Sequence, residues 1–178
     1  MASAQDLRKR IKSVTNTQQI TKAMKMVASA RLRRAQAKAD ATRPYAEKIG
    51  QILRHISSSD LQDYVSPLLE TRPVKRTCYI VIGADKGLAG AYSSNVLKMA
   101  IEQIGQKTPD EYCIITTGRK PKDSLKSRHY HIDKSYSGFS YKPSYEHSLS
   151  IMEHALSMYE SHEVDEVIMI YTRFVNSM

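Results

Sequence analysis

Long apolar runs are missing from this sequence of 178 residues. No stretch of about eighteen consecutive apolar residues occurs, so we expect no helix that spans a membrane. The beginning, MASAQDLRKRIK, is charged and no apolar stretch follows it, which is not the pattern of a secretory signal. It contains Asp6 and is not rich in arginine and serine, so a transit peptide is not expected either.

Cysteine is scarce as well. The two cysteines, Cys78 and Cys113, both lie in apolar runs typical of strands. Two buried, reduced thiols of a cytosolic protein are therefore expected, rather than a disulfide. Because there are only two cysteines and the histidines are not clustered, nothing in the sequence indicates a zinc site.

Glycine and proline are absent from Ala4 to Arg43, and this stretch has the pattern of a long helix. Ser3 followed by Asp6 is typical of a capped helix start. Pro44 predicts a kink or a joint, after which the pattern resumes and ends at residues 57–60. Apolar or small residues recur mostly every three or four positions, at Leu7, Ile11, Val14, Ile20, Met24, Val27, Ala28, Ala35 and Ala39.

A helix of about forty residues is about 60 Å long, which is more than a small domain can bury. Its apolar stripe is narrow and is interrupted by Gln18 and Thr21. We therefore expect this helix to pack against another helix or another chain, as a coiled coil with a loosely specified seam.

Positive charge is concentrated on the same segment. Residues 1–60 contain 13 Lys and Arg against 4 Asp and Glu, whereas residues 61–178 contain 14 of each kind, so the whole net charge of +9 lies on the first third. Such a surface suits nucleic acid, an anionic membrane surface or an acidic protein. No aromatic residue occurs in residues 1–44, which argues against base stacking in the first case.

The remainder of the chain has a different pattern of apolar residues and turns. Residues 61–73, with Pro67 and Pro73, are expected to form a connection. The alternation that follows predicts an α/β fold over residues 74–178, with a mainly parallel, Rossmann-like sheet. Strands are predicted at 78–82, 112–116, 129–132 and 164–175, and helices at 91–104, from Gly118 (short and broken early by Pro121) and at 145–160, capped by Ser144.

The loop after the first predicted strand, IGADKGLAGAYSSN at residues 82–95, stands where phosphate-binding loops occur. A P-loop needs its lysine directly after the last glycine, but here Lys86 precedes Gly87. Only the GxxG half of the dinucleotide fingerprint is present. The loop is therefore expected to be a tight turn in which Asp85 caps the turn or reaches outward, and Lys86 and Tyr92 are exposed for a partner.

Catalytic patterns are not evident either. Ser93, Ser94 and the six histidines form no nucleophile motif. His129 and His131 are expected at the surface of a strand without a third ligand, and Glu163, Asp165 and Glu166 as solvated turn charges. Two functions stay open on these grounds: a nucleic-acid-binding protein that uses the basic helix, and a nucleotide-dependent enzyme that uses the loop at 82–95.

Several ordered blocks of the sequence resemble one family. ITKAMKMVASARLRRAQ at 20–36 closely resembles the N-terminal helix of the gamma subunit of F-type ATP synthase, and DKGLAGAYSSN at 85–95 resembles that family's loop after the first strand. RPYAEKI, GRKPKD, YSGFSYKPSYE and IYTRFVNSM follow in the expected order. The resemblance covers essentially the whole chain.

The resemblance implies a rotor of the central stalk. In the family, two long helices form an antiparallel coiled coil inside a hexamer of alpha and beta subunits, and a Rossmann-like domain lies near the epsilon subunit and the ring of c subunits. The gamma subunit transmits torque between the membrane ring and the catalytic hexamer, binds no nucleotide or cofactor, and performs no bond chemistry. The expected location is peripheral, on the cytoplasmic face of a bacterial cell membrane.

The resemblance also implies two contact regions. The rotor–beta contacts are Ile20, Thr21, Lys22, Met24, Lys25, Met26 and Val27, and the beta-facing loop is Asp85, Lys86, Gly87, Leu88, Ala89 and Gly90. Ala89 stands where the family usually has cysteine, and no dithiol insertion of the chloroplast type is present. The family's second, C-terminal shaft helix is absent after Met178, so we expect this sequence to be a fragment.

Overall fold

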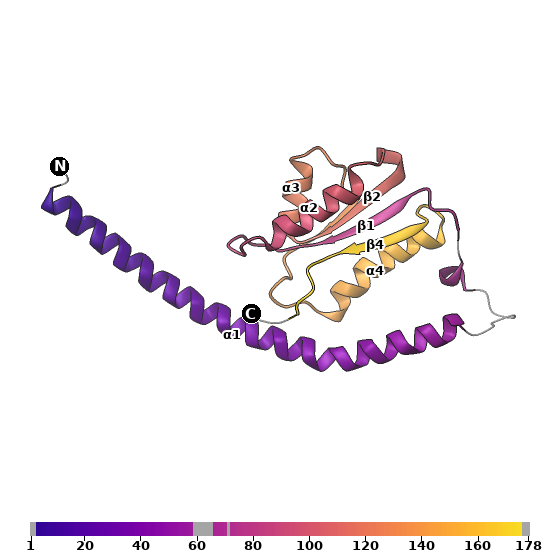
Figure 1. The fold of residues 1–178 in the computed structure, drawn as a ribbon, viewed down its shortest axis with the longest axis horizontal. Coiled ribbons are helices and arrows are strands. Elements are labelled where there is room, and N and C mark those ends of the chain that lie inside the picture. The colour runs from indigo at the N-terminus through magenta and orange to yellow at the C-terminus, as the bar shows by residue number, and fades with distance from the viewer. Residues whose placement is uncertain (1–2, 59–65, 71, 176–178) are drawn as a thin grey trace. The chain divides into compact units, whose positions relative to one another are not determined.

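The computed structural model describes residues 3–58, 66–70 and 72–175, and the chain divides into two compact units, Met1–Tyr64 and Val65–Met178 (Figure 1). The first unit consists of a single helix, α1, which runs from Ala4 to Ser58 and is 55 residues long. The side chains of Ser3 and Asp6 close its first turn: the Asp6 amide donates to Ser3 Oγ at 3.2 Å, and the Ser3 amide donates to Asp6 Oδ2 at 3.3 Å. The predicted capped start is therefore confirmed.

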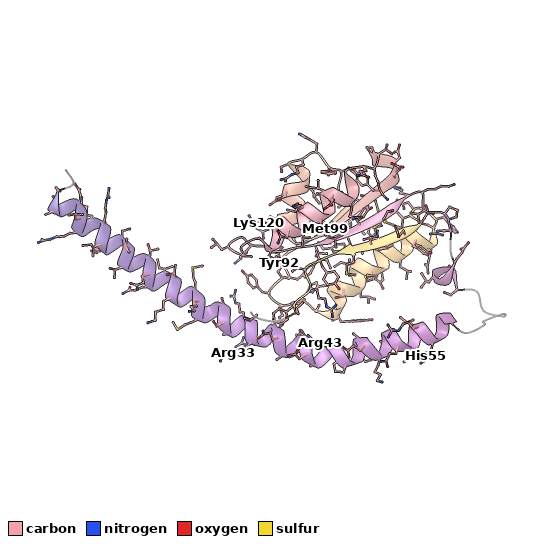
Figure 2. All side chains as sticks on the ribbon, viewed as in Figure 1. Arg33, Arg43, His55, Tyr92, Met99 and Lys120 are labelled. Carbon is pink, nitrogen blue, oxygen red and sulfur yellow. The ribbon has the colours of Figure 1, made fainter. Side chains whose placement is uncertain are left out.

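Pro44 lies inside α1 and does not end it. The helix changes direction close to Arg43, which Figure 2 labels, while remaining continuous. Proline lacks the amide hydrogen and crowds the preceding turn, so it bends a helix where neighbouring turns hold the backbone. Of the two predicted outcomes at Pro44, the structure shows the bend and not the joint.

The apolar stripe of α1 is uncovered. None of its described residues is buried within this unit, and its large apolar side chains are all exposed. Several threonines of the helix bond back to it: the hydroxyls of Thr15, Thr17 and Thr21 donate to backbone carbonyls three or four residues earlier, at 2.9 to 3.0 Å. The helix is confirmed, and the coiled-coil partner for its stripe remains a prediction.

The second unit is a sheet with helices on both faces. The strands are β1 (Thr77–Ile82), β2 (Tyr112–Thr117), β3 (Lys134–Tyr136) and β4 (Glu166–Ile170), and the helices are α2 (Tyr92–Ile104), α3 (Arg119–Lys126) and α4 (Tyr145–Glu160), with 3-10 turns at Pro67–Leu69 and Pro109–Glu111. The strand order is β3-β2-β1-β4, and each neighbouring pair is parallel. The predicted parallel, Rossmann-like sheet is confirmed.

Alternate residues of the central strands form two cores. Tyr79, Val81 and Ile114 lie on the face that α2 and α3 cover, with Leu97 and Leu125 from those helices. Cys78, Ile80, Cys113 and Ile115 lie on the opposite face, with Ile151, Ala155 and Met158 of α4. Figure 1 shows the two helices on one side of the sheet and α4 on the other. Both faces are thus buried, as parallel sheets require.

The two cysteines are free and buried, as the sequence predicts. Cys78 and Cys113 lie opposite each other in the register of β1 and β2. The hydrogen bond with Cys78 and burial raise the pKa of the Cys113 thiol, so it stays protonated and unreactive at neutral pH.

Three predicted elements are wrong in their detail. The third strand is at 134–136 and not at 129–132, because His129 has a φ of 64°, outside the strand region. The fourth strand ends at Ile170, because Val81 is the last residue of β1 that pairs with it. Pro121 does not break α3, since it is the third residue of the helix, where the amide hydrogen has no partner within the helix.

Candidate functional site

The loop at residues 83–91 leaves the carboxyl end of β1, the strand at which the sheet order reverses. β2 lies on one side of β1 and β4 on the other, and ligands of open parallel sheets bind at such a switch point. The loop passes close to the start of α3: a side chain at Gly83 would meet Pro121 Cγ at 2.5 Å. Gly118, with a φ of 94°, approaches the Gly83 carbonyl still more closely, so neither position accepts a side chain.

Asp85 holds this edge of the sheet together. Its carboxylate is buried, with 7% of the residue exposed, and it accepts hydrogen bonds from two other segments, the start of α3 and residues 138–140. The amide of Arg119 donates to Oδ1 at 3.0 Å, and the amides of Gly138 and Ser140 donate to Oδ2 at 3.0 and 3.1 Å. The Ser140 hydroxyl donates to the same oxygen at 2.5 Å.

These bonds decide the charge state of Asp85. Burial alone would raise the pKa of this carboxyl, but the hydrogen bonds from Ser140, Gly138 and Arg119 outweigh it and hold the pKa below its usual value. Asp85 is therefore an internal anion that joins the loops after β1, β2 and β3. Neither predicted role describes Asp85: its carboxylate does not reach outward, and the amides from which it accepts belong to Arg119, Gly138 and Ser140 and not to its own turn.

The other end of the loop is open to solvent. Leu88 is 93% exposed and has a φ of 61°, an unusual conformation for a leucine. The Lys86 ammonium lies 4.8 Å from the centre of the Tyr141 ring. Tyr92 is half-buried and burial raises its pKa, so it is less available to a partner than the sequence suggests.

A cavity of about 510 Å³ lies between this loop, α2 and α3. Its cationic lining residues are Lys86, Lys98, Lys120 and Arg128, and none of its lining residues is acidic. Its floor is apolar because Leu97 and Ile101 of α2 form part of it. No local sequence pattern predicts this cavity, since its cations come from the loop, α2 and the α3 region, which together span residues 86–128 of the chain.

The two histidines expected on a strand are not part of one. His129 and His131 are both exposed, as predicted, but His129 lies in a turn and neither residue belongs to a strand. Among the residues that the structure describes, no three His, Cys, Asp or Glu side chains are close enough to hold a metal ion.

The acidic cluster before β4 is not a set of solvated charges. Asp165 accepts hydrogen bonds from the amides of Lys75 and Arg76, at 2.9 and 3.0 Å, and pairs with Arg72 at 3.3 Å. The bonds from these amides lower the pKa of the Asp165 carboxyl. Glu163 is 3.6 Å from Arg76. The prediction for Asp165 was wrong because its partners are about ninety residues earlier in the chain, in the segment directly before β1. The pairing of β1 with β4 brings this segment to Asp165.

Arg72, close to the start of β4, has a structural role that no sequence pattern indicates. Its guanidinium donates to the carbonyls of Tyr159 and Val164, at 2.8 and 2.6 Å, and lies 4.1 Å above the Tyr159 ring. Together with its pairing to Asp165, these contacts fix the segment before β1 to the α4–β4 junction.

The predicted shaft contacts lie on α1. Ile20, Met24 and Val27 are spaced to share one face of the helix, and each is at least half exposed. Lys22, Lys25 and Met26 lie on the opposite face of the helix. All of these side chains are exposed, and their contacts stay a prediction.

Fold and site together define a class of protein: a long exposed helix followed by a Rossmann-like domain in which the loop after β1 borders a basic cavity. The sequence matches the model of the family described as ATP synthase over residues 3–178. The chain therefore belongs to this family, and the relatives that it resembles are gamma chains.

Two curated relatives illustrate the likeness. The ATP synthase gamma chain of Desulfitobacterium hafniense is 41% identical over 178 residues, which is 100% of this chain and 63% of the relative. The ATP synthase gamma chain of Brevibacillus brevis is 41% identical over 175 residues, which is 97% of this chain and 61% of the relative. The chain thus spans less than two thirds of the length of these relatives.

A solved structure has the same fold. It is the central stalk and c ring of the Tetrahymena thermophila mitochondrial ATP synthase, with a TM-score of 0.69 and 24% identity, covering 88% of this chain and 66% of that chain. Within the described residues, no helix is both long enough and apolar enough to cross a membrane.

Proposed function

We propose that this chain is part of the central-stalk rotor of a proton-driven F-type ATP synthase, where it transmits torque between the membrane c ring and the catalytic alpha/beta hexamer. The observation that carries the proposal is α1, a continuous helix of 55 residues with an uncovered apolar stripe and a strongly basic surface, in a chain of the ATP synthase family. Such a helix has no use in an isolated domain, because it buries none of its apolar side chains there.

The dimensions and charge of α1 suit a shaft. At about 1.5 Å per residue it is about 80 Å long, several times the width of a small domain. Its apolar stripe supplies a seam for a second helix, and its cations supply attraction to acidic surfaces around it. This attraction is expected to weaken with salt where the charges are exposed.

The proposed contacts with the beta subunits are those that the resemblance implies. On the shaft they are Ile20 to Val27, and on the α/β domain they are the exposed members of the loop from Asp85 to Gly90. Because the Asp85 carboxylate is used inside the domain, the outer surface of this loop consists of Lys86, Leu88 and Ala89.

The proposal assigns this chain no bond chemistry and no cofactor of its own. The further partners in the proposal are the epsilon subunit and the c ring, with association to the cytoplasmic face of a bacterial cell membrane through the complex. Neither a nucleic-acid partner nor catalysis with a nucleotide is part of it.

The experiment is a pull-down with the tagged chain from a lysate that contains alpha and beta subunits, with and without nuclease. Recovery of alpha and beta in a fixed ratio, unchanged by nuclease, supports the rotor. A matched variant, Met24→Glu, changes one residue of the proposed contact and should reduce the recovery because acidic walls repel it. Retention of nucleic acid with a steep salt dependence, in place of alpha and beta, would contradict the proposal.

A further inference from the structure

The cavity beside the loop lies between two helices on one face of the sheet. α2 and α3 contact each other there, and Figure 1 shows them side by side. Residues 86–90 line one end of the cavity. Its volume of about 510 Å³ is within the range of about 300–1,000 Å³ that is typical of small-molecule sites.

Positive charge reaches this cavity from three directions. Lys86 belongs to the loop, Lys98 to α2, and Lys120 to α3, with Arg128 two residues after that helix ends. The Lys120 side chain, labelled in Figure 2, reaches over the loop: a side chain at Gly87 would meet its Nζ at 3.8 Å. The Arg128 guanidinium donates to the Ser124 carbonyl at 3.0 Å, which holds it at the rim. Since no lining residue is acidic, these charges are not neutralised within the cavity.

Hydroxyl groups also line the cavity. They belong to Ser93, Ser94 and Ser124, and the Ser94 hydroxyl already donates to the Ala91 carbonyl at 3.1 Å. The Ser93 hydroxyl oxygen is buried and has no hydrogen-bond partner among the described residues. It lies in the first turn of α2, where the N-cap residue Ala91 provides no side-chain cap. The Tyr92 amide donates to the Ala89 carbonyl at 3.2 Å, which leaves the amides of Ser93 and Ser94 for an acceptor.

We propose that this cavity binds a phosphorylated small molecule. Its phosphoryl oxygens would accept from Ser93 and the first turn of α2 and would lie against the Lys120 ammonium, because hydroxyl, amide and ammonium donors with no competing carboxylate are the surroundings that phosphate requires. The organic part of the ligand would rest on Leu97 and Ile101. This site shares residues 86–90 with the proposed beta-facing loop, and it needs neither the P-loop nor the dinucleotide fingerprint, which the sequence lacks.

The test is isothermal titration of the 178-residue chain with AMP and with pyrophosphate, at constant ionic strength and with sulfate as the control anion. We expect saturable binding of one equivalent, with AMP bound more tightly than sulfate. Lys120→Gln should weaken AMP binding about tenfold, the loss expected for one charge-assisted contact. The matched control is Lys126→Gln, which makes the same change on α3 at a residue that lines a different cavity.

A second variant distinguishes binding inside the cavity from general attraction of anions by positive charge. Ser93→Ala keeps the net charge and removes only the unpartnered hydroxyl, so it should also weaken AMP binding several-fold while thermal unfolding stays unchanged. Absence of saturation, or equal weakening by Lys120→Gln and Lys126→Gln, would overturn the proposal. So would stronger binding of a glutamate-rich peptide than of AMP, since the occupant would then be an acidic protein segment.

A further experiment determines whether the bound phosphate belongs to a lipid headgroup or to a soluble phosphate ester. Binding to vesicles that contain phosphatidylglycerol, lost in Ser93→Ala and absent with phosphatidylcholine alone, would assign the phosphate to a lipid headgroup. Binding of AMP without binding to these vesicles would assign it to a soluble phosphate ester. Either result supports a phosphate site, and neither depends on the pull-down of alpha and beta subunits.

Discussion

Replacing Asp85 by asparagine tests whether one carboxylate holds the loops at the edge of the sheet. In the native domain, Oδ1 accepts from the Arg119 amide, and Oδ2 accepts from the Gly138 amide and from the amide and hydroxyl of Ser140. An asparagine that keeps its oxygen at the Oδ2 position must turn its NH2 group toward the Arg119 amide. One hydrogen bond is then lost and two donors face each other, while the remaining three bonds lose the assistance of the charge.

We expect Asp85→Asn to lower the free energy of unfolding by about 2–3 kcal/mol at pH 7, because a buried hydrogen bond to a charged group contributes about 1.5–3 kcal/mol. Asp85→Ala should cost more, since it leaves three buried amides without their acceptor. Urea unfolding followed by tyrosine fluorescence measures the difference in the α/β domain, which contains 9 of the 11 tyrosines. The control is Asp110→Asn, at an exposed aspartate of the same domain.

The same variant has a predictable pH dependence. The pKa of Asp85 is lowered in the folded protein, so its stabilisation is fully present above the ordinary carboxyl pKa of about 4 and is lost as the pH falls through the lower folded value. The stability gap between the native chain and Asp85→Asn should therefore be constant from pH 7 to 5 and close below about pH 4. An equal gap at pH 7 and at pH 3, or no gap at pH 7, would refute the role given to this carboxylate.

Three further predictions follow from the shaft, the Arg72 contacts and the buried thiols. In the proposed rotor, Met24→Lys would place an extra cation against the acidic surface around the shaft, and it should lower coupled ATP synthesis in membrane vesicles that carry the substituted rotor; unchanged synthesis would contradict the proposed contact. Arg72→Met removes the hydrogen bonds to two carbonyls and the ion pair with Asp165, so it should lower the free energy of unfolding by about 3 kcal/mol in the same urea assay. A loss under about 1 kcal/mol would contradict the stabilising role given to these contacts. Cys78 and Cys113 should react with a thiol reagent only at the rate of unfolding, and fast labelling in native buffer would show that the sheet opens.

The elements of this fold were predictable where local pattern determines them. The absence of glycine and proline from Ala4 to Arg43 predicts α1, and apolar runs bounded by turns predict β1 and β2. The parallel order follows from strands that alternate with helices. Periodicity does not reveal how far a strand continues, because that depends on its neighbour: β4 ends after Ile170, where β1 no longer pairs with it.

The site was predictable only in part for the same reason. The sequence places the loop after β1 and indicates that it is not a phosphate loop of a known kind. It does not reveal that Asp85 bonds to residues 53 and 55 positions away, or that Arg72 reaches carbonyls 87 and 92 positions away. Contacts over such separations are created by the topology of the sheet, and a polar residue in a turn gives no local sign of them.

Three threonines of α1 affect how the helix could hydrogen-bond to a surrounding subunit. Thr15, Thr17 and Thr21 each give their hydroxyl hydrogen to a carbonyl of the helix itself, at 2.9 to 3.0 Å. A hydroxyl whose hydrogen is donated in this way has none left to donate to a surrounding subunit. If α1 turns inside a hexamer, as proposed above, each hydrogen bond to the surrounding subunits would have to be broken at every step, and these three hydroxyls would donate none.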